Sequence, residues 1–146
     1  MKSNINLIII DANFILLPFQ FKIDYFTEIR NNLEGKLRFI VFQQVLNELE
    51  AKKKRQPQAI KFARVFNSGL VYLERNKKIH EVDFLKDVKK IDETTDEFLL
   101  RKLIKLKNKN HNVFLATNDS DLRKKAKNLG LSVIFLRQKK FLCFEF

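Results

Sequence analysis

The stretch that most constrains the fold is residues 5–11, Ile-Asn-Leu-Ile-Ile-Ile-Asp, an apolar run that ends in a carboxylate. The run is rich in β-branched isoleucine and does not alternate with polar residues, which is typical of a parallel strand covered by helices on both faces. In open parallel sheets, ligand sites lie outside the carboxyl ends of the strands. We therefore expect Asp11, at the end of this strand, to lie in a functional site.

Strands and helices alternate along the rest of the chain. Apolar runs predict further strands at residues 37–42, 79–82, 113–117, 131–136 and 141–146. Helical spacing of apolar residues predicts helices at residues 23–33, 43–53, 57–73, 94–106 and 119–130. Residues 12–18 are too short for a stable helix, and residues 83–92 show only a dense run of charges. The alternation predicts an α/β fold with a mostly parallel sheet, in one domain that spans residues 1–146.

Four residues mark starts or bends of the predicted helices. Pro57 suits the first turn of the third helix, and Gly69 would allow a bend within it. Thr94 and Glu97 have the spacing of a capping box, which predicts a helix start at this point.

Composition limits the compartment and the partners. The 146 residues are 45% hydrophobic, which is enough for one core, and they contain a single cysteine, Cys143, so no internal disulfide can form. No secretory signal and no apolar span of about 20 residues is present, so we expect a cytoplasmic protein without a membrane partner. The net charge of +12 favours a polyanion, most simply nucleic acid. A solvated basic surface is the simpler alternative.

Four acidic residues occupy positions where chemistry is expected: Asp11, Glu48, Asp96 and Asp119. Asp11 and Asp119 each follow a strand, and a switch point in the strand order would place both at one sheet edge. Asp96 opens a helix on its apolar side, and Glu48 borders the apolar stripe of another helix. Each helical acid also has a simpler interpretation: Asp96 complements the helix dipole, Asp119 caps a helix, and Glu48 is a surface residue.

Four carboxylates at one edge would repel one another unless a divalent cation neutralised them. Oxygen ligands select a hard cation such as Mg²⁺ or Mn²⁺. The sequence offers no set of cysteines and histidines for zinc, and we expect the isolated His80 and His111 to be structural.

Four segments are similar, in order and spacing, to the successive motifs of PIN-domain ribonucleases. They are residues 8–14 (IIIDANF), 45–49 (VLNEL), 95–96 (TD) and 116–122 (ATNDSDL). Residues 13–14 and 17–20 further resemble archaeal single-domain PIN proteins related to small-subunit rRNA processing factors. VapC-type toxins of toxin–antitoxin pairs are the other familiar single-domain members. Residues 11–13 are also similar to the Asp-x-Asp start of haloacid-dehalogenase phosphatases, but the second Asp is replaced by Asn13.

The resemblance implies a three-layer α-β-α fold of about five strands in the order 3-2-1-4-5, and a Mg²⁺- or Mn²⁺-dependent endoribonuclease. The residues matching its catalytic metal-site acids are Asp11, Glu48, Asp96 and Asp119. Asp121 matches a more variable fifth position beside the metal ligands. The residues that would orient the carboxylates are Asn13, Thr117 and Asn118. Ala12 stands where the family often has Thr or Ser, which puts in doubt one supporting hydrogen bond near Asp11.

Basic residues near these acids would form the RNA track: Lys52, Lys53, Lys54, Arg55, Arg123, Lys124 and Lys127, with Lys125 beside them. Phe19 and Phe21 could stack on bases, although core packing is the simpler interpretation. The expected role is rRNA processing or ribosome assembly. A VapC-type toxin with an antitoxin partner and a weakly catalytic RNA-binding assembly module remain alternatives. Homodimers are common in the family, but the sequence reveals no interface.

Overall fold

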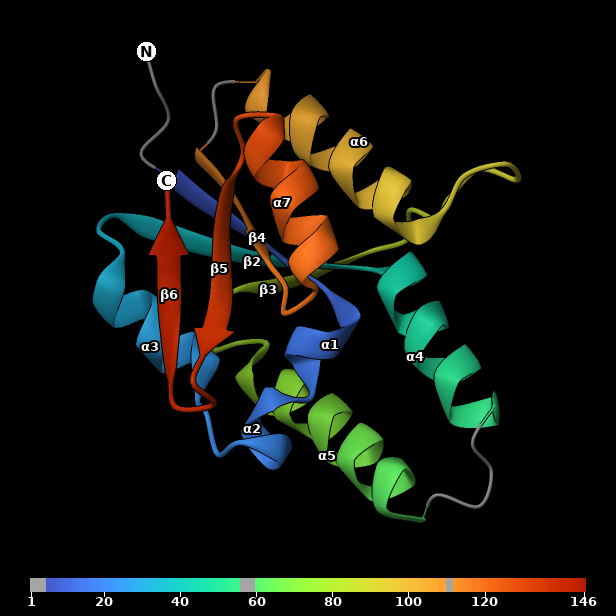
Figure 1. Cartoon of the computed structure of the whole chain (residues 1–146). Coiled ribbons are helices and arrows are strands. Elements are labelled where there is room, and N and C mark those ends of the chain that lie inside the picture. The colour runs from blue at the N-terminus through green and yellow to red at the C-terminus, as the bar shows by residue number, and fades with distance from the viewer. Residues whose placement is uncertain (1–4, 56–59, 110–111) are drawn as a thin grey trace.

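The computed structural model describes residues 5–55, 60–109 and 112–146, and Figure 1 shows how their helices and strands are arranged. The strands are β1 (Ile5–Ile10), β2 (Lys36–Phe42), β3 (Val82–Leu85), β4 (Asn112–Ala116), β5 (Ser132–Arg137) and β6 (Phe141–Glu145). The helices are α1 (Ala12–Ile15), α2 (Leu17–Gln20), α3 (Tyr25–Asn32), α4 (Gln43–Arg55), α5 (Ile60–Asn76), α6 (Thr95–Lys107) and α7 (Ser120–Asn128). Pro57 and His111 lie outside the described residues, so the predictions made for them stay predictions.

One sheet, in the order β3-β2-β1-β4-β5-β6, organises the molecule. β1 lies at its centre and pairs in parallel with both β2 and β4, so that Ile9 is opposite Ile40 on one side and Leu115 on the other. β5 continues the parallel sheet, and β6 adds an antiparallel edge strand. The predicted order 3-2-1-4-5 is confirmed, and the last apolar run of the chain supplies the sixth strand.

Helices cover both faces of this sheet, as the consecutive apolar residues 7–10 of β1 require. Ile8, Ile9 and Ile10 have no exposed surface. Parallel connections are right-handed, so the connections from β1 to β3 place α1–α5 on one face, and the returning connections place α6 and α7 on the other (Figure 1). The three-layer α-β-α prediction is confirmed. No helix in the described part of the chain is long and apolar enough to cross a membrane.

The third strand was predicted at residues 79–82, and this placement is wrong because β3 is Val82–Leu85. The segment before β3 forms a turn in which the His80 amide donates to the Asn76 carbonyl at 2.9 Å. Ile79 is 72% exposed in this turn, and Glu81 has a positive φ of 53°. Ile79, which suggested a strand, is therefore a surface residue. Residues 83–85, at the start of the charged segment for which no structure was predicted, belong to β3.

The segment after β1 forms two single-turn helices where no stable helix was expected. α1 and α2 are held by tertiary packing, since Phe14, Ile15 and Leu17 are fully buried. α5 crosses them closely at Gly69, where an added Cβ would lie 3.1 Å from Leu16 Cδ2 and 3.3 Å from the Ile15 carbonyl oxygen. The role of Gly69 is thus close helix packing, and α5 runs through this position as one helix.

Candidate active site

Asp11 lies at the carboxyl end of the central strand and is 8% exposed. Its backbone N–H donates to the Ala116 carbonyl at 3.0 Å, which ties the end of β1 to the end of β4. Its carboxylate accepts hydrogen bonds from the Ala12 amide at 2.8 Å and from the Thr117 hydroxyl at 2.7 Å. Burial, helped by the nearby carboxylates of Asp96 and Asp119, nevertheless raises the pKa of Asp11 to about 6.

Asp96 and Asp119 approach Asp11 from the first turns of two helices. Burial raises the pKa of Asp96, and the negative charges of Asp119, Glu48 and Asp121 add to this effect, while the positive charge of Lys125 opposes it. The mutual repulsion indicates that acids from α4, α6 and the start of α7 gather beside the end of β1. The sequence prediction that one edge of the sheet collects these acids agrees with this placement.

Asp119 is also the N-cap of α7. Its Oδ1 accepts hydrogen bonds from the amides of Asp121 at 2.9 Å and Leu122 at 3.1 Å. The capping interpretation and the cluster interpretation therefore both hold for this residue, because one oxygen caps the helix while the charge of the carboxylate acts on Asp11 and Asp96.

The predicted orienting residues fix the backbone and the carboxylates of the cluster. Thr117 has no exposed surface, donates to Asp11 and accepts from the Asp119 amide at 3.1 Å, so one hydroxyl links the two acids. Asn13 Oδ1 accepts from the Asn118 amide at 2.9 Å. Asn118 Oδ1 in turn accepts from an amide of β5 at 3.0 Å. The Asn13 side chain thus ties the segment after β1 to the loop after β4, and the Asn118 side chain ties that loop to β5.

The carboxylate oxygens of these acids are chemically suited to bind a hard divalent cation. Within the described residues, no group of three or more His, Cys, Asp or Glu side chains is already arranged to hold a metal ion. The carboxylates are nonetheless near enough to disfavour one another's ionisation, and a cation is the simplest charge that removes this penalty. All candidate ligands are oxygen atoms, which matches Mg²⁺ and Mn²⁺.

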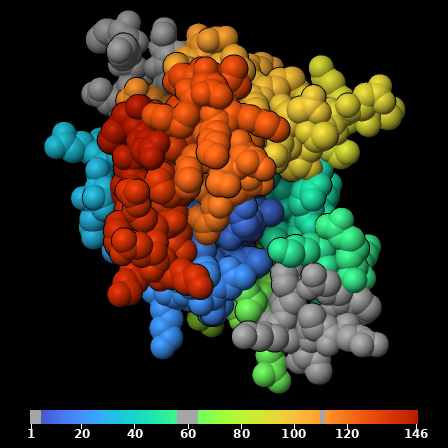
Figure 2. All heavy atoms as spheres, in the orientation of Figure 1, coloured from blue at the N-terminus to red at the C-terminus, as the bar shows by residue number. Residues whose placement is uncertain are grey.

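The segment that follows β1 lies in a hollow of the molecular surface. In Figure 2, the segment that follows β1, in blue, lies at the bottom of a depression between α7 in orange and α4 in teal. A separate cavity of about 420 Å³ lies at the opposite ends of the strands, where Asn6, Asn112 and Ser132 line it. That cavity is distinct from the acid cluster, since Asn6 and Asp11 mark opposite ends of β1.

Comparison with known proteins now identifies the family, because residues 8–139 match the family described as PIN like domain. The chain belongs to the PIN-like domain family. It is 27% identical over 134 residues to ribonuclease VapC4 of Methanocaldococcus jannaschii, and the match covers 92% of each chain. The fold is similar to that of the PIN domain endonuclease Utp24, with a TM-score of 0.65 and 23% identity over 95% of this chain and 90% of that one.

The predicted RNA-binding residues of this PIN-like domain fall on α4 and α7. Lys52, Lys53, Lys54 and Arg55 form the last turn of α4. The Lys53 ammonium lies 4.9 Å from the centroid of the Phe66 ring, and the Arg123 guanidinium lies 3.9 Å from the centroid of Phe135. Lys124 is exposed, whereas Lys127 donates to the Phe146 carbonyl at 3.0 Å. Arg123 is therefore the predicted contact whose side chain is most firmly oriented by an aromatic ring.

Other side chains are placed by the fold in structural roles. His80 stacks on Phe26 with ring centroids 5.1 Å apart, which agrees with its expected structural role. Phe21 packs against the core, but Phe19 is 48% exposed and meets the edge of Tyr72, so core packing accounts for only part of its surface. Cys143 is half-buried.

Sequence reasoning missed Gln44 as a residue of the site, and it gave Thr95 no role beyond its place in the motif at residues 95–96. Gln44 is 5% exposed, and its amide nitrogen donates to the Thr95 hydroxyl at 3.2 Å. The Thr95 hydroxyl donates to Glu48 Oε1 at 2.6 Å. The sequence carries only a weak sign of this role. Gln44 is a polar residue at a buried position of α4, two residues after β2, where an apolar residue is usual.

Proposed function

We propose that this PIN-like domain is a Mg²⁺- or Mn²⁺-dependent endoribonuclease. The observation that supports the proposal most directly is the gathering of Asp11, Asp96 and Asp119 at one sheet edge, where burial and mutual repulsion raise the pKa of Asp11 to about 6. An unneutralised acid cluster is unfavourable in a folded protein, so its presence in a chain of net charge +12 favours a site built for a cation.

The residues that would hold the cation are Asp11, Glu48, Asp96 and Asp119, with Asp121 beside them. Such an ion supplies Lewis acidity toward water and toward the phosphoryl oxygens of a phosphodiester. Thr117 keeps the carboxylate of Asp11 in one orientation, and the α7 cap does the same for Asp119. No side-chain nucleophile is needed, because water attacks phosphorus in line with the leaving oxygen.

RNA is the substrate class that the surface charge and the named relative support. The last turn of α4 carries four consecutive basic residues, and α7 presents Arg123, Lys124 and Lys125 directly after Asp119. Contacts of this kind bind phosphates without reading sequence, so the cleavage site would depend on RNA shape or on further contacts. Phe19, which is half-exposed, is a candidate for stacking on a base.

The proposed biological role is rRNA processing or ribosome assembly in the cytoplasm, which rests on the motif resemblance described above. A second candidate is a toxin ribonuclease with an antitoxin partner. It is favoured by the 27% identity to ribonuclease VapC4 over nearly the full length of both chains. A weakly catalytic RNA-binding module is the third candidate, and a purely binding role would leave the four acids without a purpose. A homodimer is compatible with each role.

Cleavage of structured and single-stranded RNA with Mg²⁺ or Mn²⁺ tests the activity. We expect cleavage by the wild type, no cleavage with chelator, and a loss of at least about 100-fold in Asp11→Asn, because a cation ligand is removed. Equal cleavage by the two proteins would remove the assignment. Binding of RNA without cleavage by either protein would instead support the non-catalytic module.

Crosslinking of Asp11→Asn to RNA in cells, followed by sequencing, tests the role. Recovery of one site in rRNA or its precursor would support processing, whereas recovery of tRNA or mRNA would support a toxin. Growth arrest on expression of the wild type, relieved by the product of a small neighbouring gene, would also favour the toxin.

A further inference from the structure

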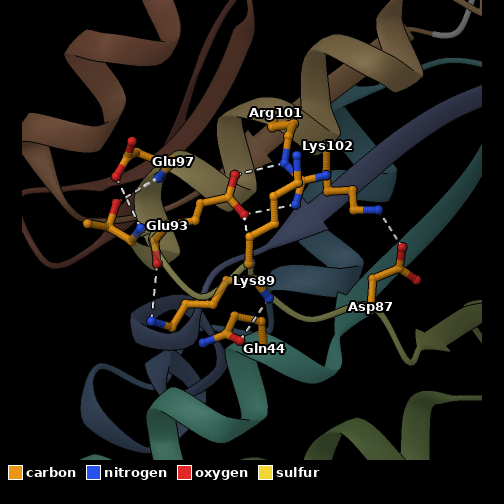
Figure 3. Close-up of polar contacts among 9 residues, drawn as sticks. Gln44, Asp87, Lys89, Glu93, Glu97, Arg101 and Lys102 are labelled. Atoms are coloured by element: carbon orange, nitrogen blue, oxygen red, sulfur yellow. Dashed lines mark hydrogen bonds and ion pairs between the residues drawn. The ribbon is translucent and has the colours of Figure 1, made fainter.

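The segment between β3 and α6, residues 86–94, forms neither helix nor strand but is fastened at both ends to α6 (Figure 3). Asp87 pairs with Lys102 at 2.5 Å. Glu93 accepts hydrogen bonds from Arg101 Nε at 2.7 Å and Nη2 at 2.8 Å. The two ends of this loop are therefore held to one rigid helix, which gives the loop a defined position.

Gln44 fastens the same loop to the start of α4. Its backbone N–H donates to the Asp87 carbonyl at 3.3 Å, and its side-chain Oε1 accepts from the Lys89 amide at 3.1 Å. Figure 3 shows the Gln44 side chain directed at the backbone of Lys89. Gln44 is 5% exposed, so its amide group is committed to these protein contacts rather than to solvent.

A chain of three hydrogen bonds leads from this loop to an acid of the site. The Lys89 amide donates to Gln44 Oε1, Gln44 Nε2 donates to the Thr95 hydroxyl at 3.2 Å, and the hydroxyl donates to Glu48 Oε1 at 2.6 Å. Thr95 immediately precedes Asp96, so the residue that contacts Glu48 is the neighbour of the acid on α6.

The donor-to-acceptor direction of this series of three hydrogen bonds is fixed by the groups at its two ends. A backbone N–H can only donate, and an ionised carboxylate can only accept. Gln44 must therefore turn its oxygen to Lys89 and its nitrogen to Thr95, and the single hydroxyl proton of Thr95 is left for Glu48. Reversing any link would leave a polar group of this series without its partner, which is unfavourable for a buried group.

We infer that Gln44 and Thr95 are positioning residues, which transmit the fixed geometry of the 86–94 loop to the Glu48 carboxylate and hold it for a divalent cation. The inference rests on the proposed function, since it takes Glu48 as one of the acids that hold the cation. The Thr95 hydroxyl donates to Oε1 of Glu48, so this contact restricts the orientation of the carboxylate.

The test measures Mn²⁺ affinity in the absence of RNA, by titration calorimetry on the full chain. Thr95→Val keeps the shape of the side chain and removes the hydroxyl, whereas Thr95→Ser keeps the hydroxyl. Gln44→Glu keeps the shape and replaces the amide donor by an acceptor, so two carboxylates compete for one hydroxyl proton. We expect Thr95→Val and Gln44→Glu to weaken Mn²⁺ binding by roughly tenfold or more, and Thr95→Ser to bind within about twofold of the wild type.

Gln43→Glu is the matched control for added charge. Gln43 is exposed on the same helix, one residue away, and it contacts Asn47 rather than the 86–94 loop. An extra negative charge alone would strengthen cation binding, so weaker binding in Gln44→Glu but not in Gln43→Glu isolates the reversed hydrogen bond. Binding by Gln44→Glu that equals or exceeds that of the wild type would overturn the inference, provided that its thermal unfolding is cooperative.

The outcomes separate this inference from the proposed function. If the wild type does not bind Mn²⁺ and Asp11→Asn cleaves RNA as well as the wild type, the proposed function fails. If the wild type binds Mn²⁺ and Thr95→Val binds it equally well, only the positioning role fails. Should Gln44→Glu not fold, the comparison of Thr95→Val with Thr95→Ser decides the question alone.

Discussion

The Thr117 hydroxyl donates a hydrogen bond to Asp11 Oδ2 at 2.7 Å, between residues 106 positions apart in the chain. The same hydroxyl accepts the amide of Asp119 at 3.1 Å. Because Thr117 has no exposed surface, water cannot replace either bond. This single oxygen connects the strand-end acid of β1 with the capping acid of α7.

Thr117→Val should destabilise the protein, since it leaves the buried Asp11 carboxylate and the Asp119 amide without their partner. We expect a loss of about 1–3 kcal/mol in the free energy of unfolding, measured in urea. Thr117→Ser, which keeps the hydroxyl, should lose less than half of that amount. Equal losses in both variants would indicate that the methyl group, rather than the hydrogen bonds, is what matters.

Asp11→Asn should make the metal-free protein more stable at pH 7. The pKa of Asp11 is raised from 3.8 to about 6, so its ionisation costs the folded state about 3 kcal/mol above pH 6. Asparagine carries no charge but loses about 1 kcal/mol with one of the two hydrogen bonds. The expected net gain is about 2 kcal/mol, by urea unfolding in the presence of chelator.

The pH dependence gives this prediction a second measurement. Between pH 3.8 and about 6 the folded wild type holds a proton on Asp11 that the unfolded chain has lost, so its stability falls as the pH rises through this window. The stability difference between Asp11→Asn and the wild type should therefore grow from pH 4 to pH 6 and stay constant above it. A difference that does not change with pH would contradict the buried-charge explanation.

Mn²⁺ should reverse the order of stability. A ligand that binds only the folded state stabilises it by about 2.7 kcal/mol at a concentration 100 times its dissociation constant. The wild type should therefore melt at a higher temperature with Mn²⁺ than without it, and Asp11→Asn should respond much less. An unchanged melting temperature of the wild type at millimolar Mn²⁺ would favour the non-catalytic RNA-binding module.

Substitutions of Asp119 should affect stability and RNA cleavage differently. Asp119→Asn retains an oxygen that can cap α7, so we expect its stability to stay within about 0.5 kcal/mol of the wild type, whereas Asp119→Ala should lose about 1 kcal/mol. Both variants should lose metal-dependent RNA cleavage. An active Asp119→Asn would mean that the residue serves as a helix cap and not as a cation ligand.

Arg123 should contribute one phosphate contact. Its guanidinium lies 3.9 Å from the Phe135 ring centroid and is thus oriented before RNA binds. Arg123→Ala should weaken RNA binding for all sequences and reduce the slope of log K against log salt concentration by about one, measured by fluorescence anisotropy. Lys36→Gln, at the opposite end of the sheet in register with Ile5, is the control and should leave the slope unchanged.

The layered fold was predictable because its signals are local. Ile8, Ile9 and Ile10 of β1 are fully buried, and the Thr94–Glu97 capping box forms at the start of α6 as its spacing predicts. β3 was misplaced because Ile79 and Val82 read alike in sequence, although one is on a turn and the other begins a strand. Single-turn helices such as α1 depend on packing, which a short segment does not reveal.

The acids of the site were predictable for a different reason. A carboxylate directly after a buried strand, as at Asp11, has few structural explanations, and parallel strands bring their ends together. Gln44 could not be predicted, since its role depends on the amide of Lys89 and on Thr95, which lie 45 and 51 positions away. Ordinary helical residues become site residues only when distant segments meet.

The parallel pairing of β1 with β4 has a consequence for synthesis of the protein. Asp11 emerges from the ribosome before β4 and the start of α7, which follow it by about 100 residues in the chain. The acids therefore cannot meet on a nascent chain that still lacks β4 and α7, and the proposed RNA-cleaving centre would form only after both have been made.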